Sequence, residues 1–281
     1  MDSKLEKRLM SMVDEMPPFP KSVHRVIELT NDLNCAPKDL VQVIEHDPVI
    51  TMKLLKLVNS AYFSLAKSIA SVRHALVYLG LNTVKNLALS IATVGALPRS
   101  KSDVFDSNAF LLHSLTTAAI AQRLAKEHLS NKDATDVFVA GLLHDFGKAV
   151  AVQFMPQEFS QAVMKAREEG IALHEAEKEV IGADHTQIGA MLAETWQLPS
   201  ELVESIRNHH QPELLDDDGM CIFVANQISK KLEFGFSGNP QVDALPESLK
   251  ARFGGMDLDA LIESLGDMSA EVEKAESFIY M

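Results

Sequence analysis

The residues with the clearest capacity for chemistry are an adjacent pair, His144 and Asp145, at the end of a strongly apolar run. Gly147 and Lys148 follow the pair directly. An imidazole nitrogen is a borderline metal ligand and a carboxylate oxygen a hard one, so the pair fits a site for Zn, Fe or Mn better than it fits a structural thiolate site. A dipeptide alone is weak evidence, because short motifs also match by chance.

Other histidines fall on the apolar stripes of expected helices in the same half of the chain. His113 follows Phe110 by three residues, His185 lies on the stripe of its own helix, and the pair His209–His210 ends a third stripe. A single histidine on such a stripe is usually a satisfied core residue. Several of them can instead converge inside a helix bundle, as bundle metal sites do. The candidate metal ligands are therefore His113, His144, Asp145, His185, His209 and His210.

Almost the whole chain has helical periodicity, and no segment has sustained strand alternation or an internal repeat. Asp47 caps a helix that starts at Pro48, and Ser71 and Gly80 bound another. These patterns predict an all-α fold. The other expected helices are 22–33, 37–46, 82–97, 107–128, 133–154, 156–169, 173–181, 184–197, 200–210, 220–233 and one or two within 257–279.

A polar stretch that begins at Pro98 and ends at Asp106 separates an N-terminal half from a C-terminal half. An acidic turn is expected from Asp216 to Gly219. Residues 235–255 are rich in Gly, Pro and Ser and are expected to be irregular. The sequence therefore predicts four parts. They are an N-terminal helical arm at 1–15, a helical subdomain at 16–98, a helical core at 107–233, and an irregular segment with helices at 234–281.

The amino-acid composition limits the classes of function that this protein can have. The chain has 281 residues, 47% of them hydrophobic, with a net charge of −13. Such an acidic surface argues against binding nucleic acid or an anionic membrane through the bulk surface. No signal peptide and no run long enough to span a membrane is evident, and two distant cysteines, Cys35 and Cys221, fit a reducing compartment. We therefore expect a cytoplasmic protein.

The order of the candidate ligands resembles the HD phosphohydrolase superfamily. That resemblance implies an HD-type helical core that holds one or two divalent metals through a His, a His-Asp doublet and a later Asp. Here Asn226 stands at the position of the later Asp. This departure puts in question the first metal site, which is the one formed by the His, the His-Asp doublet and the later Asp. The second set, which joins His185 and the His209–His210 pair to a bridging Asp145, is complete.

The N-terminal half resembles the HDOD family of bacterial signalling modules, which are generally regulatory rather than catalytic. The matching features are Met16-Pro17-Pro18-Phe19-Pro20, the Asp47-Pro48 helix start, Leu57-Val58-Asn59-Ser60-Ala61 and the Leu79-Gly80 ending. The segment Glu194 to Pro199 also fits, and the resemblance covers roughly residues 16–230. The Gly-Tyr-Pro loop of the HD-GYP phosphodiesterases is absent after His210, so cleavage of cyclic di-GMP is not expected.

Two functions follow from this reading, and the sequence leaves both open. The favoured one is a signal-transduction module with a degenerate HD metal site, which binds a signalling protein or a small ligand without turnover. The alternative is a metal-dependent phosphohydrolase acting on a nucleotide or another phosphoester. In that case the metals would activate water, and Lys148 would contact the phosphate. The expected cofactor is a divalent metal (Fe, Mn, Zn, Ni or Mg), with no other cofactor expected.

Overall fold

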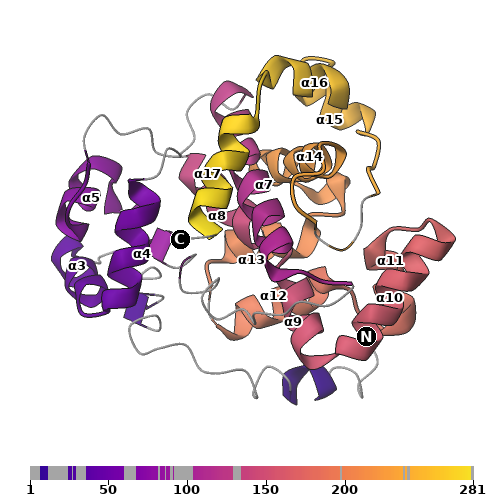
Figure 1. Cartoon of the computed structure of the whole chain (residues 1–281), viewed down its shortest axis with the longest axis horizontal. Helices are drawn as coiled ribbons and strands as arrows, with labels where there is room; N and C mark the ends of the chain where they lie inside the picture. Colours follow the sequence, from indigo (N-terminus) through magenta and orange to yellow (C-terminus); the bar gives the residue numbers. More distant parts are fainter. Residues whose placement is uncertain are drawn as a thin grey trace.

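A computed structural model of the chain describes residues 7–11, 25, 26, 28, 29, 36–59, 68–81, 83–85, 87, 88, 91, 104–128, 134–196, 198–236, 238 and 241–279. Every regular element among these residues is a helix (Figure 1), which confirms the all-α fold class. The expected 1–15 arm, the 22–33 and 82–97 helices and the 98–106 boundary lie largely outside the described residues. The four-part division itself stays a prediction.

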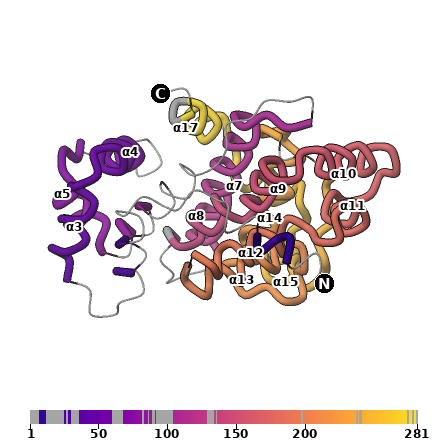
Figure 2. The backbone as a smooth tube through the Cα atoms, turned by 90° about the horizontal axis from the view of Figure 1, so that it is seen from below, coloured from indigo at the N-terminus to yellow at the C-terminus, as the bar shows by residue number. Residues whose placement is uncertain are grey.

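Three helices form the described part of the N-terminal half: α3 (Pro37–Glu45), α4 (Pro48–Val58) and α5 (Val72–Leu79). They pack against one another and lie to one side of the remaining helices (Figures 1 and 2). Asp47 accepts hydrogen bonds from the backbone N–H groups of Val49 and Ile50 at 3.0 and 3.1 Å. This side-chain cap satisfies donors that the first turn leaves free, so α4 begins where the sequence predicted.

The C-terminal half is built around α7 (Ser107–His128), which starts and ends where the periodicity predicted. Its neighbours are α8 (Ala134–Leu143), α14 (Asp217–Lys231) and α17 (Ser269–Ile279), which pack along it (Figure 1). Side chains on all faces of α7 between Phe110 and Ala125 are buried. A helix buried all round forms the centre of a core.

The prediction of a single helix over residues 133–154 is wrong. The chain leaves the helical path at His144 and Asp145, and α9 (Phe146–Phe154) starts directly afterwards. Asp145 has φ −99° and ψ 3°, which is outside the α-helical region. Apolar periodicity continues through both helices, so the pattern did not reveal the break. The break is what places the His-Asp pair at the junction of two helices.

Two further expectations are corrected. The acidic stretch at 216–219 is not a separate turn, because Asp216 caps α14 through the Gly219 N–H at 2.9 Å and the helix starts at Asp217. Negative side chains are favourable in a first helical turn. The segment 235–255 is not wholly irregular either, since it contains α15 (Glu247–Arg252).

The remaining helices follow the predicted order with ends shifted by a few residues. They are α10 (Pro156–Glu169), α11 (Leu173–Val180), α12 (His185–Thr195), α13 (Ser200–Asn208) and α16 (Leu258–Leu265). The short 3-10 helix η1 (Pro212–Leu214) was not predicted. Among the described residues, one stretch, Asp136–Phe154, has the length and composition to cross a membrane, but 89% of it is buried inside the protein.

Candidate metal centre

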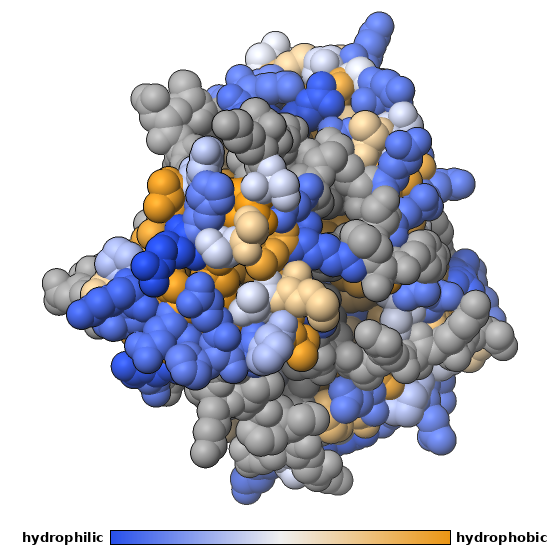
Figure 3. All heavy atoms as spheres, turned by 60° about the vertical axis from the view of Figure 1, so that its left-hand side comes forward, coloured by the Kyte–Doolittle hydropathy of each residue, from blue (hydrophilic) through white to orange (hydrophobic). Residues whose placement is uncertain are grey.

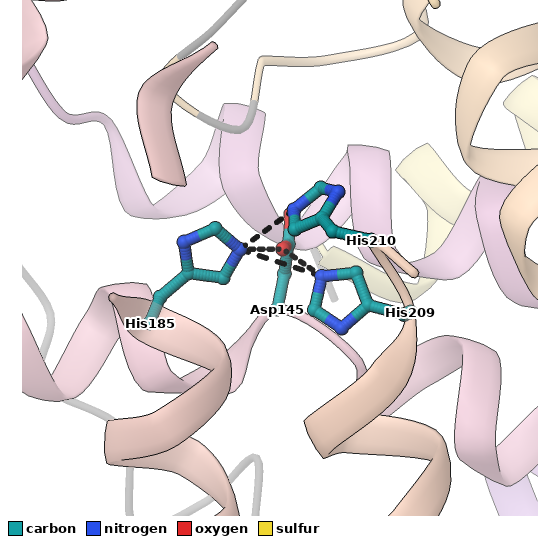
Figure 4. A group of neighbouring side chains, drawn as sticks. All are labelled: Asp145, His185, His209 and His210. Carbon is teal, nitrogen blue, oxygen red and sulfur yellow. Dashed lines mark hydrogen bonds and ion pairs between the residues drawn. The ribbon is translucent and has the colours of Figure 1, made fainter. Parts of the chain in front are cut away.

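The candidate ligands predicted from the sequence converge at one place in the C-terminal half. They form two groups that share Asp145, and within each group the potential ligand atoms lie within 4.8 Å of one another. One group is Asp145 with His185, His209 and His210 (Figure 4), and the other is Asp145 with His113 and His144. Five of these six residues are fully buried, and His210 is partly buried.

The two oxygens of Asp145 face different groups. Oδ1 lies 3.3 Å from His185 Nε2 and 3.4 Å from His209 Nε2. Oδ2 lies 3.3 Å from His144 Nε2 and 3.8 Å from His113 Nε2. The carboxylate of Asp145 therefore lies between the two groups, and its role as a bridging metal ligand stays a prediction.

The ring orientation of three histidines is fixed through Nδ1. His144 Nδ1 donates to the Gly141 carbonyl at 2.7 Å, and His209 Nδ1 donates to the Ile206 carbonyl at 2.8 Å. His185 Nδ1 donates to Glu177 Oε2 at 2.5 Å. These hydrogen bonds hold a proton on Nδ1 and leave Nε2 facing the centre, and the lone pair of a deprotonated Nε2 is the form that binds a metal.

Burial keeps most of these rings neutral. It lowers the pKa of His113 and His210 well below the usual value and that of His209 to about 3, although Asp145 opposes the shift at His113 and His209. At Asp145, burial disfavours the charge, but His144 and Lys148 outweigh it and lower the pKa of the carboxyl well below its usual range. The centre therefore combines an ionised carboxylate with three imidazoles, His113, His209 and His210, that burial keeps neutral.

The geometry fits a cation at the group that contains His185. His185 Nε2 lies 3.3 Å from His209 Nε2 and 3.0 Å from His210 Nε2. Lone pairs at such distances repel unless a proton or a metal lies between them. Burial lowers the pKa of His185, but Glu177 and Asp145 more than offset this and raise it. When a metal is bound, these four residues would hold it and the metal would supply Lewis acidity.

The other group contains three candidate ligands, and the resemblance places Asn226 at the position of a fourth, which stays a prediction. Asn226 is 1% exposed and lies on α14, which packs against α7 and α8. Neither polar atom of its side chain has a hydrogen-bond partner within the described residues, and the Nε2 atoms of His113 and His144 also lack one. Unpartnered buried polar atoms are costly, so each of these side chains has unused capacity to bind a ligand. A neutral amide oxygen is a poorer ligand for a transition metal than a carboxylate.

Lys148 contacts the carboxylate rather than solvent. Its Nζ lies 2.6 Å from Asp145 Oδ2, and the residue is 2% exposed. Lys148 therefore neutralises the oxygen that faces His113 and His144. The predicted contact with phosphate stays a prediction.

Three residues of the site escaped the sequence analysis. Glu177 is fully buried and also accepts a hydrogen bond from the His185 backbone N–H at 2.9 Å. His174, which is half-buried, stacks on His210 with ring centroids 4.3 Å apart. Lys230 lies four residues after Asn226, one turn further along the same face of α14, and this spacing could have revealed it. Nothing in the sequence pattern singled out Glu177.

Comparison with known proteins defines the class to which this fold and site belong. The family model of the HDOD domain matches residues 16–212, most of the chain. The chain therefore belongs to the HDOD family, which confirms the resemblance.

Solved structures and a curated relative agree with this assignment. An HDOD domain protein of unknown function from Geobacter sulfurreducens superposes with a TM-score of 0.78 at 28% identity, over 99% of this chain and 98% of that one. A protein from Shewanella amazonensis SB2B named "Putative phosphohydrolase" superposes with a TM-score of 0.75 at 26% identity, over 97% and 98% of the two chains. An uncharacterized protein of Treponema pallidum is 26% identical over 255 residues, which cover 89% of this chain and 48% of that protein, so this chain spans about half the length of that relative.

Proposed function

We propose that this chain is a regulatory signalling module that holds one divalent metal through Asp145, His185, His209 and His210. In this proposal it acts by binding a partner or ligand and does not turn over a substrate. The observation that carries the proposal is the contrast between the two groups at Asp145. One group has four convergent ligands, whereas the other has a neutral Asn226 in place of its last carboxylate.

The missing carboxylate argues against two-metal hydrolysis. Paired metals stabilise both the attacking and the leaving oxygens of a phosphoryl transfer, and a single metal provides only part of this stabilisation. Lys148 at Asp145 Oδ2 already supplies one positive charge where the first metal would lie. A protein with one metal and one lysine at this centre is suited to hold an anionic ligand.

The exposed face of the N-terminal helices supports the binding role. Val49 and Met52 of α4 are 55% and 64% exposed, and Val77 and Tyr78 of α5 are 73% and 57% exposed. Hydrophobic side chains gather on this face among hydrophilic ones (Figure 3). Exposed apolar patches on soluble proteins often mark interaction sites. The binding partner would be a signalling protein, in line with the sequence-based expectation.

Metal content tests the proposal. Protein purified without a chelator or an affinity tag should contain close to one equivalent of Fe, Mn, Zn or Ni, and His185→Ala should lose it. His46→Ala, which changes an exposed histidine on the N-terminal half, serves as the matched control and should keep the metal. A wild-type protein that stays metal-free after incubation with these ions would refute the metal-binding part of the proposal.

The second candidate is a metal-dependent phosphohydrolase, and the intact ligand group beside Lys148 is the observation that favours it. The name of the Shewanella amazonensis neighbour points the same way. The metal-loaded protein should then hydrolyse a nucleotide or another phosphoester, with loss of activity in Asp145→Ala. Such turnover would overturn the non-catalytic proposal, while its absence across a panel of nucleotides and phosphomonoesters would remove the alternative.

A further inference from the structure

The helix α4 carries an exposed stripe in which apolar and basic side chains are combined. Its members recur at positions i, i+3, i+4 and i+7, so they share one face of the helix. They are Val49, Met52, Lys53 and Lys56, which we call the α4 stripe. The two apolar side chains are more than half exposed and the two lysines are partly exposed, whereas the buried residues of α4 lie on its other face.

The neighbouring helix α5 has exposed side chains of the same two kinds. Arg73, Val77 and Tyr78 are exposed on it, and α5 packs against α4. The ring of His74 meets the ring of Tyr78 edge-on, with centroids 4.9 Å apart, and this contact orients the tyrosine. Hydrophobic side chains lie among hydrophilic ones on this side of the molecule (Figure 3). A partner on the α4 stripe would therefore have α5 beside it.

The charge of these two helices differs from that of the chain as a whole. They contain Lys53, Lys56 and Arg73 and no acidic residue, whereas the chain has a net charge of −13. None of these three side chains forms an ion pair with a residue that the structure describes. Asp47 precedes α4, but its carboxylate caps the helix. The positive charge is therefore available to a partner of opposite charge.

Charge also distinguishes among the possible occupants of this surface. A symmetric contact between two copies of the chain would place Lys53 and Lys56 against their own counterparts, which like charges oppose. Recruitment to an anionic membrane typically uses clusters of about four to eight basic residues, more than α4 and α5 provide. A protein segment that carries carboxylates beside apolar side chains complements both features of the stripe.

The spacing of the stripe favours a helical partner. An amphipathic helix can lay its own i, i+3, i+4 and i+7 side chains along such a face. Methionine is flexible and adapts to an incoming apolar surface, so Met52 suits this role. Exposed ion pairs contribute little to affinity, so the apolar contacts would supply most of it. The lysines would then select an acidic partner over a basic one.

We infer that the α4 stripe docks an acidic amphipathic helix of a partner protein. The apolar side chains of that helix would pack on Val49 and Met52, and its carboxylates would lie beside Lys53 and Lys56. The inference rests on the proposed function in so far as that function requires a protein partner, and it specifies the chemistry of this partner. It does not depend on the metal, because the candidate ligands all lie in the C-terminal half.

Fluorescence anisotropy of a labelled peptide with the full chain tests the inference. The probe is a synthetic amphipathic helix of about four turns, with leucines along one face and glutamates on both flanks. A second peptide has lysine in place of each glutamate. The acidic peptide should bind about tenfold more tightly than the basic one, because only its charges complement the stripe. Its binding should weaken as salt is added, since salt screens exposed charges.

Substitutions on the surface locate the binding site. Met52→Glu places a like charge in the stripe and should weaken binding of the acidic peptide about tenfold or more. Met164→Glu is the matched control, because Met164 is also exposed, at 46%, and lies on α10. This control should stay within about twofold of the wild type, as expected for a charge far from the stripe.

A second pair of variants tests the charges alone. The double variant Lys53→Gln and Lys56→Gln should reduce the preference for the acidic peptide about threefold or more, because two favourable charges are lost. Lys38→Gln changes an exposed lysine on α3, outside the stripe, and should leave the preference unchanged.

Several results would overturn the inference. They are absence of binding by the acidic peptide, equal binding of the two peptides, and equal effects of Met52→Glu and Met164→Glu. A dimer in sedimentation that Met52→Glu dissociates would assign the stripe to a second copy of the chain. Binding to phosphatidylserine vesicles that Met52→Glu abolishes would assign it to a membrane, and either result would also overturn the inference.

Metal content, measured on every sample, reports separately on the proposed metal site. Peptide binding by a metal-free protein would support the inference and contradict the metal-binding part of the proposed function. A metal-loaded protein that does not bind the acidic peptide would overturn the inference and leave the metal site standing.

Discussion

Gly147 lies so close to α12 that a Cβ atom on it would come within 2.0 Å of the backbone oxygen of His185. It would also lie 2.8 Å from the backbone nitrogen of Gly189. This contact brings α9, which follows Asp145, against the helix that starts at His185. The close approach of the two backbones is therefore part of what assembles the candidate metal centre.

Gly147→Ala should accordingly disturb both stability and metal binding. The clash is with backbone atoms, which cannot move aside as a side chain can, so we expect destabilisation by about 1–3 kcal/mol or more. Gly189→Ala is the control and should cost less, because its Cβ would meet Ile206 Cγ2 at 3.0 Å and the backbone nitrogen of Gly147 at 3.3 Å, which are both longer contacts than the one at Gly147. Denaturant unfolding of both variants, together with metal analysis, checks this. Equal stability of Gly147→Ala and the wild type would contradict the packing argument.

Glu177→Gln should weaken the metal at the His185 group without altering the ligands themselves. The carboxylate fixes the His185 ring through Nδ1 at 2.5 Å, and loss of such a supporting partner typically lowers metal affinity about 10–100-fold. Competition with a chromophoric chelator measures the change. Glu179→Gln, an exposed position on the same helix, should bind metal as the wild type does. Unchanged affinity in Glu177→Gln would show that His185 needs no such partner.

Asn226→Asp should create a second metal position. The new carboxylate would join His113, His144 and Asp145, whose nitrogens and oxygens already converge. Metal content should rise from about one to about two equivalents, whereas Asn226→Ala should keep one. Without metal, the added buried charge should destabilise the protein by on the order of 1–3 kcal/mol, and added metal should reverse this. A folded Asn226→Asp protein that still binds one equivalent of metal would contradict the prediction of a second metal position.

Asp184, the N-cap of α12, should make stability depend on pH below about 4. Burial disfavours its charge, but His185 and hydrogen bonds from Thr186, Gln187 and Lys178 prevail and lower its pKa from 3.8 to about 2. A lowered pKa in the folded state means that the ionised group stabilises the fold above pH 4, and that this contribution is lost as the pH falls through about 2. The shift corresponds to about 2 kcal/mol.

Urea unfolding of the wild type and of Asp184→Asn at several pH values measures this contribution. The stability difference between the two proteins should be constant from pH 5 to 7 and should shrink towards pH 2. A difference that does not change with pH would mean that the charge of Asp184 makes no contribution.

Much of this protein can be inferred from the sequence because its local signals are strong. Helical periodicity and capping residues such as Asp47 and Ser71 act within a few residues, so they determine helix positions wherever they occur. The ligand residues were recognisable because their types and their order along the chain resemble those of a known superfamily.

The tertiary structure decided what depends on contacts between distant segments. Continuous apolar periodicity concealed the break at His144 and Asp145, because both flanking helices are buried. Glu177 and His174 became part of the site only through packing, which brings α11 beside residues far away in sequence. Side chains on separate helices acquire a shared chemistry only when burial and close packing fix their distances, and no spacing along the chain records those distances.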